Sequence, residues 1–167
     1  MIKIDKHDFD IADDQDEIRV DGLCRELLRE FHCSLPERGV PPLEAGALAH
    51  GADYYLRDFL VAALRANPFS EAHGMVRRFA ATWYITSNLE PNIGELVGYL
   101  EGVRELYRFL HRGRLISAPF MAQVELECGD IPYYEQRIDT FLAITGDGYY
   151  AWAGECTLKT GGGNDTP

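Results

Sequence analysis

The spacing of the apolar residues most constrains this fold, because they recur at steps of three and four over most of the chain and never alternate over a long stretch. Such spacing puts them on one face of an α-helix. It is clearest over residues 93–113, where Asn92 and Glu95 form a capping-box pattern and Gly113 ends the run. The stripe contains Ile93, Leu96, Val97, Leu100, Val103, Tyr107 and Leu110, widened by Tyr99, Leu106 and Phe109. A stripe this broad predicts a central helix with several neighbours.

Similar periodicity and capping signals predict further helices elsewhere in the chain. They cover residues 14–35, 43–66, 67–88, 118–127 and 132–144. In the first, Asp14 is the expected N-cap and Cys24 lies on the buried stripe. The third begins at Asn67 or at Ser70. The chain is therefore predicted to be all-α, an irregular bundle of five or six helices.

The rest of the chain connects or follows these helices. Residues 37–42, with one glycine and two consecutive prolines, form a connector, and residues 145–148 form a turn. After that turn, aromatic side chains are available to dock the next segment on the bundle; they are Tyr149, Tyr150 and Trp152. We expect a single helical domain over residues 1–160 and a flexible C-terminal tail over residues 161–167.

Composition limits the environment and the partners. The chain has 167 residues, 46% of them hydrophobic, which is enough to build one core. Its formal charge of -11 disfavours unaided binding to nucleic acid or to anionic membranes. Charged residues interrupt every apolar stretch, and the acidic N-terminal segment does not fit a signal or transit peptide. We therefore expect a cytoplasmic protein without a membrane span.

Charge is unevenly distributed along the chain. The formal charges are -7 for residues 1–64, +2 for residues 65–114 and -6 for residues 115–167, which sum to -11. The middle region supplies the candidate contacts to phosphate or to a partner, namely Arg77, Arg78, Arg104, Arg108 and Arg112. Glutamates three residues before Arg104 and Arg108 support a competing interpretation, in which these arginines form a solvated, ion-paired helix face.

Two segments carry a family resemblance: YYLRDFL at residues 54–60 and GYLEGVRELYRFLHRGRLI at residues 98–116. Residues 43–117 thereby resemble the helical core-binding domain of phage-type tyrosine recombinases. The resemblance implies a small helical clamp on DNA. It does not extend to catalysis, because beyond residue 117 the chain has one Arg, one Lys and no His with which to surround a nucleophilic tyrosine.

Local motifs for catalysis, metals and cofactors are absent from the sequence. The four cysteines are widely spaced, and the five histidines show neither HxxxH nor HExxH spacing. There is no G-x-S-x-G, Walker or dinucleotide-binding glycine pattern. We therefore predict reduced thiols and name no catalytic, cofactor-binding or metal-ligating residue. A site assembled from residues distant in sequence stays open.

The function expected by elimination is a non-catalytic helical interaction or regulatory module that engages another protein. Two alternatives remain: a DNA-contacting domain like the core-binding domain, and an enzyme with a nonlocal site. An interaction module should leave an exposed apolar or aromatic patch after the bundle is built.

Overall fold

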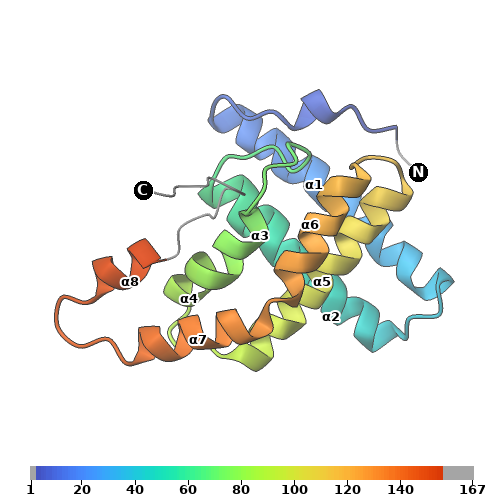
Figure 1. Ribbon diagram of the computed structural model, residues 1–167. Helices are drawn as coiled ribbons and strands as arrows, with labels where there is room; N and C mark the ends of the chain where they lie inside the picture. The colour runs from blue at the N-terminus through green and yellow to red at the C-terminus, as the bar shows by residue number, and fades with distance from the viewer. Residues whose placement is uncertain (1–2, 156–167) are drawn as a thin grey trace, which may run out of the picture.

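The computed structural model describes residues 3–155 and confirms the all-α prediction. These residues form seven helical runs and a 3-10 turn, without a strand (Figure 1). The 3-10 turn is Lys6–Phe9, and the α-helices are α1 (Asp14–Glu37), α2 (Pro42–Asp53), α3 (Met75–Arg78), α4 (Tyr84–Ser87), α5 (Ile93–Arg112), α6 (Ala118–Gly129), α7 (Ile131–Leu142) and α8 (Tyr149–Glu155). The π-helical segment Tyr54–Ala63 continues α2, and another, Phe79–Trp83, joins α3 to α4.

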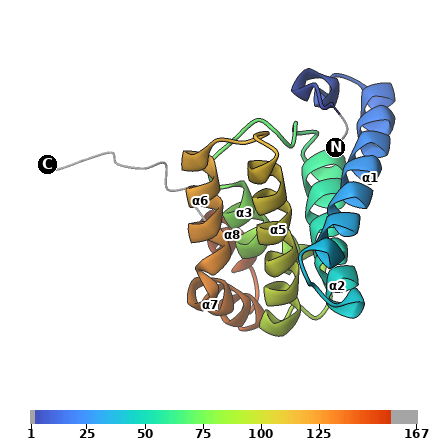
Figure 2. The ribbon, with the colours of Figure 1, turned by 90° about the vertical axis from the view of Figure 1, so that its right-hand side faces the viewer.

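Helix α5 is central, as its broad apolar stripe predicts. The Asn92 side chain caps it by accepting a hydrogen bond from the Glu95 backbone N–H at 2.8 Å. Its neighbours include α2 on one side and α6 and α7 on the other, which Figure 2 shows as successive layers. The described part of the chain is thus organised around one helix.

Glycines allow α2 and α5 to approach closely. A Cβ atom added at Gly102 would overlap the Leu48 carbonyl oxygen, and one added at Gly51 would lie 2.9 Å from Cα of Tyr99. Both clashes are with backbone, which a side-chain rotation cannot relieve. The crossing therefore requires hydrogen in place of a side chain at both positions.

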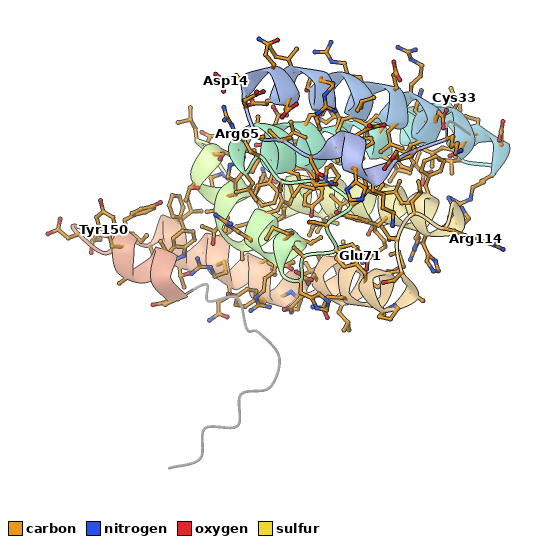
Figure 3. All side chains as sticks on the ribbon, turned by 90° about the horizontal axis from the view of Figure 1, so that it is seen from above. Asp14, Cys33, Arg65, Glu71, Arg114 and Tyr150 are labelled. Carbon is orange, nitrogen blue, oxygen red and sulfur yellow. The ribbon has the colours of Figure 1, made fainter. Side chains whose placement is uncertain are left out.

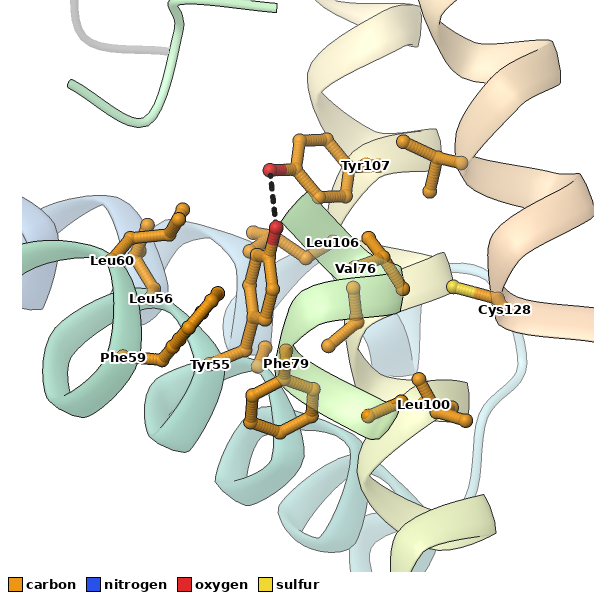
Figure 4. Close-up of a cluster of buried hydrophobic side chains, with 14 of the residues drawn as sticks. Tyr55, Leu56, Phe59, Leu60, Val76, Phe79, Leu100, Leu106, Tyr107 and Cys128 are labelled. Atoms are coloured by element: carbon orange, nitrogen blue, oxygen red, sulfur yellow. Dashed lines mark hydrogen bonds between the residues drawn. The ribbon is translucent and has the colours of Figure 1, made fainter. Parts of the chain in front are cut away.

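The core beside this crossing is rich in aromatic rings (Figure 4). Tyr55 and Phe79 pack edge to face with ring centroids 5.2 Å apart, and both side chains are fully buried. The Tyr107 hydroxyl donates a hydrogen bond to the Tyr55 hydroxyl at 3.4 Å. Burial is the main cause that raises the pKa of both phenols, so the pair is neutral and each ring keeps a polar partner inside the core.

Two helix starts differ from the sequence prediction. Asp13 caps α1 through the Asp16 backbone N–H at 2.9 Å, one residue before the predicted cap at Asp14. The third predicted helix begins only at Met75, because Glu71 has a φ of +53°, a left-handed conformation that interrupts a right-handed helix. The Glu71 carboxylate instead accepts hydrogen bonds from the backbone N–H and hydroxyl of Ser117, both at 2.7 Å.

Two further features were not predicted, although both π-helical segments lie within the helices predicted at residues 43–66 and 67–88. The π-helical segments follow no recognised sequence signal, and α8 forms where only a docked segment was expected. The predicted tail at residues 161–167 lies outside the described residues. Within residues 3–155, no helix is both long and apolar enough to cross a membrane.

The glycine crossing gives a matched pair of variants on α5. Gly102→Ala should lower the free energy of unfolding by about 1–3 kcal/mol or more, because the added methyl group would overlap the backbone of α2. Gly98→Ala has no neighbour within 4 Å of the added carbon and should gain up to about 1 kcal/mol from helix propensity. Urea denaturation measures both. Equal effects of the two substitutions would contradict the close crossing.

The core position of α5 can be tested separately at Leu100, whose side chain is buried. Leu100→Ala should lower the free energy of unfolding by about 2–5 kcal/mol, through lost burial and the cavity left behind. Denaturant unfolding followed by circular dichroism measures the change. A value near zero would show that this face of α5 is not in the core.

Candidate functional site

Two of the three candidate arginines on α5, Arg104 and Arg108, are ion-paired within the molecule. The Arg108 Nε lies 2.6 Å from Glu125 on α6, and its Nη1 lies 2.6 Å from Glu105. Arg104 reaches Glu101 at 3.0 Å and the same Glu125 at 3.2 Å. The expected i,i+3 pairs are present, and Glu125 adds a link between helices that their spacing did not predict. These guanidinium groups therefore tie α5 to α6.

The other three candidate arginines are not gathered with them. Arg77 on α3 lies 3.2 Å from Asp130 and stacks over the Tyr133 ring at 3.9 Å. Arg78 follows it as an exposed residue, whereas Arg112 ends α5. Partial burial, and then the nearby charges of Arg38 and Arg108, lower the pKa of Arg112. The five side chains thus do not form one free basic surface.

A buried carboxylate that the sequence analysis did not single out caps α3 from another helix. Glu127 on α6 is 7% exposed. It accepts hydrogen bonds from the backbone N–H groups of Gly74 at 3.3 Å and Arg77 at 3.0 Å, and from the Gln123 amide at 3.1 Å. Two otherwise orphaned N–H groups of a helix start are satisfied, and a negative charge sits at the positive end of the helix dipole.

Arg137 on α7 is a buried arginine whose role was also missed. It is 3% exposed, and within residues 3–155 it forms no ion pair with a carboxylate. Its Nε donates to the Ala81 carbonyl at 3.0 Å and its Nη1 to the Trp152 carbonyl at 2.7 Å, while the guanidinium stacks on the Trp152 ring at 3.8 Å. Arg137 therefore joins α7, the segment Phe79–Trp83 and α8.

Trp152 completes the attachment of α8. Its indole N–H lies within hydrogen-bonding distance of the Arg137 carbonyl at 3.1 Å and the Thr140 hydroxyl at 3.2 Å, and its ring packs on Phe141 with centroids 4.9 Å apart. A short helix is unstable alone, so these contacts must hold α8 in place. Helix α8 is thus fixed to α7 through the Trp152 indole and the Arg137 guanidinium.

Three large side chains at the end of α7 and the start of α8 are exposed, and we call them the α7–α8 surface: Leu142, Tyr149 and Tyr150. Their exposed fractions are 60%, 42% and 83%. Tyr149 and Tyr150 pack edge to face with centroids 5.5 Å apart, and Figure 3 shows Tyr150 at the projecting end of the molecule. Of the three aromatic residues expected to dock this segment, Trp152 does so and Tyr150 points outward.

Two of the described cysteines are poorly suited to act as nucleophiles. Cys24 and Cys128 are buried, and burial is the main cause that raises the pKa of each to about 12. Cys33 is exposed, whereas Cys156 lies outside the described residues. No three His, Cys, Asp or Glu side chains in residues 3–155 come together as a metal site.

Comparisons with family models, curated proteins and solved structures give no match to this chain.

Sequence reasoning located the arginines and their partners on the same helix, but not their partner on another helix. Spacing on one helix predicts Glu101 beside Arg104, whereas Glu125 comes from α6 and requires the bundle to be known. Glu127 and Arg137 carried no local motif. Arg137 had one signal, since it is the only arginine after residue 117 and stands amid the aromatic residues of the chain's last third.

Thiol alkylation tests the burial pattern. At mildly alkaline pH, iodoacetamide should modify Cys33 and spare Cys24 and Cys128, because thiolate is the reactive form and their raised pKa keeps both protonated until the pH nears 12. Peptide mapping by mass spectrometry reads each cysteine separately. In denaturant all three should react alike. Rapid native labelling of Cys128 would contradict its placement in the core.

Proposed function

We propose that this protein is a non-catalytic helical module that engages another protein through the α7–α8 surface. The observation that carries the proposal is the exposure of Leu142, Tyr149 and Tyr150 beside a helix held by buried contacts. The proposal includes an interaction or regulatory role and a cytoplasmic location, on the sequence features given above.

Tyrosine suits such a surface for physical reasons. Its ring offers a large contact area, its hydroxyl forms hydrogen bonds, and only two side-chain torsions are ordered on binding. Trp152 and Arg137 fix the backbone that carries Tyr149 and Tyr150. Association then orders few additional groups, which lowers its entropic cost.

The carboxylate partners of the arginines weigh against the DNA-contacting alternative. A phosphate would have to displace Glu125 from Arg104 and Arg108, and Asp130 from Arg77. The acidic flanks would oppose its approach as well. Raised thiol pKa values at Cys24 and Cys128 likewise give no support to a nucleophilic enzyme.

A photo-crosslinking amino acid at position 150 tests the proposal in extract of the source cells. We expect an adduct with one other protein, identified by mass spectrometry and reproduced with that protein purified. Unlabelled wild-type protein should compete for it, whereas a Tyr149→Ser/Tyr150→Ser variant of equal melting temperature should not. The matched control carries the crosslinker at Leu89, an exposed position in the α4–α5 loop.

Three results would overturn this function. One is an equal adduct from Leu89, which would show contact without specificity. Another is an adduct of the chain with itself alone, which would make the surface a self-association interface. The third is tight, salt-sensitive binding of labelled duplex DNA that an Arg104→Gln/Arg108→Gln variant loses, which would favour the DNA-contacting alternative.

A further inference from the structure

A small groove with an apolar floor lies between the N-terminal segment and α1. Residues 3–9 run beside that helix (Figure 1), against its middle part, and the space between them is about 50 Å³. Its apolar floor comes from Ile4, Phe9, Leu23 and Leu27. Since one water needs about 10–15 Å³ of such space, the groove has room for a short chain of heavy atoms.

The groove is held open by contacts on its far side. Phe9 is buried and packs edge to face on Phe69, with ring centroids 4.8 Å apart. Arg19 on α1 donates to the Asp10 carbonyl at 3.1 Å and also bonds the Asp8 carbonyl. Both walls are therefore fixed before anything binds.

Acidic side chains dominate the rim. Among residues 3–155, it carries Asp5, Asp8, Glu26 and Glu30 against a single basic side chain, Lys3. Within residues 3–155, the Asp8 and Glu26 carboxylates form no ion pair and no hydrogen bond. Apolar floor and anionic rim together make the groove complementary to a side chain that is aliphatic along its length and positive at its tip.

We propose that this groove binds a basic side chain, arginine or lysine, of a partner polypeptide. The aliphatic stem lies on Ile4, Leu23 and Leu27, and the cationic head meets Asp8 and Glu26. Long basic side chains pack their methylenes on apolar surface while the charge stays solvated. An anionic group would be repelled here, and a wholly apolar one would desolvate the carboxylates without compensation. The inference is independent of the α7–α8 surface.

A titration of the ¹⁵N-labelled protein with the blocked peptide Gly-Gly-Arg-Gly-Gly at low ionic strength tests the proposal. Amide shifts should concentrate in residues 3–9 and in the α1 residues facing them. A peptide with 2-amino-3-guanidinopropionate in place of arginine keeps the charge and shortens the stem, so it should bind more weakly. Equal affinity of the two peptides would contradict the proposed contact between the aliphatic stem and the apolar floor of the groove.

Matched variants separate the rim from general acidity. Asp8→Asn/Glu26→Gln should weaken arginine-peptide binding by about fivefold, the value for two exposed ion pairs. Glu37→Gln/Glu44→Gln removes the same charge from exposed positions elsewhere and should leave the affinity unchanged. Equal weakening by both variants would mean nonspecific attraction and would overturn the site. Amide shifts of residues 3–9 that change when the protein alone is diluted would also overturn it, because they indicate that a second copy of the chain occupies the groove. If the crosslink at position 150 fails, the interpretation of these peptide-binding experiments does not change.

Discussion

The close crossing of α2 and α5 is the constraint on which the rest of the structure depends. Because Gly51 and Gly102 place backbone against backbone, the two helices bring their flanking side chains into one continuous core. The π-helical segment that continues α2 then carries Tyr55 and Phe59 toward Phe79 and Tyr107. Helices α6 and α7 cover the other side of α5. A wider crossing would separate these layers.

Local signals predicted the elements whose determinants lie close in sequence. The start of α5 was predicted because Asn92 and Glu95 are three residues apart, and α1 because its stripe repeats regularly from Val20 to Phe31. The start of α3 was not, since its cap, Glu127, comes from a distant helix. The π-helical turns and α8 depend on tertiary packing and could not be predicted from periodicity. The cross-helix ion pairs of the arginines were missed for the same reason.

The buried polar groups stabilise the bundle, whereas the exposed charges and tyrosines are available on its surface. Glu127 caps the start of α3, Arg137 binds backbone carbonyl groups, and Arg104 and Arg108 of α5 bind Glu125 of α6. The chain is net acidic, carries a tyrosine pair on α8 and has a groove beside the N-terminal segment. The two proposed surfaces lie on different helices and ask for different chemistry, aromatic contact at one and a cation at the other.

The long-range cap of α3 bears on how the chain folds. A carboxylate 50 residues further along completes the start of this helix, so α3 lacks that stabilisation until α6 has been joined to it. Helix α5 is capped by the adjacent residue Asn92, so its start does not depend on another helix. We therefore expect α5 to be structured early in the folding transition state and the start of α3 to be structured late, with substitutions at Glu127 accelerating unfolding rather than slowing folding.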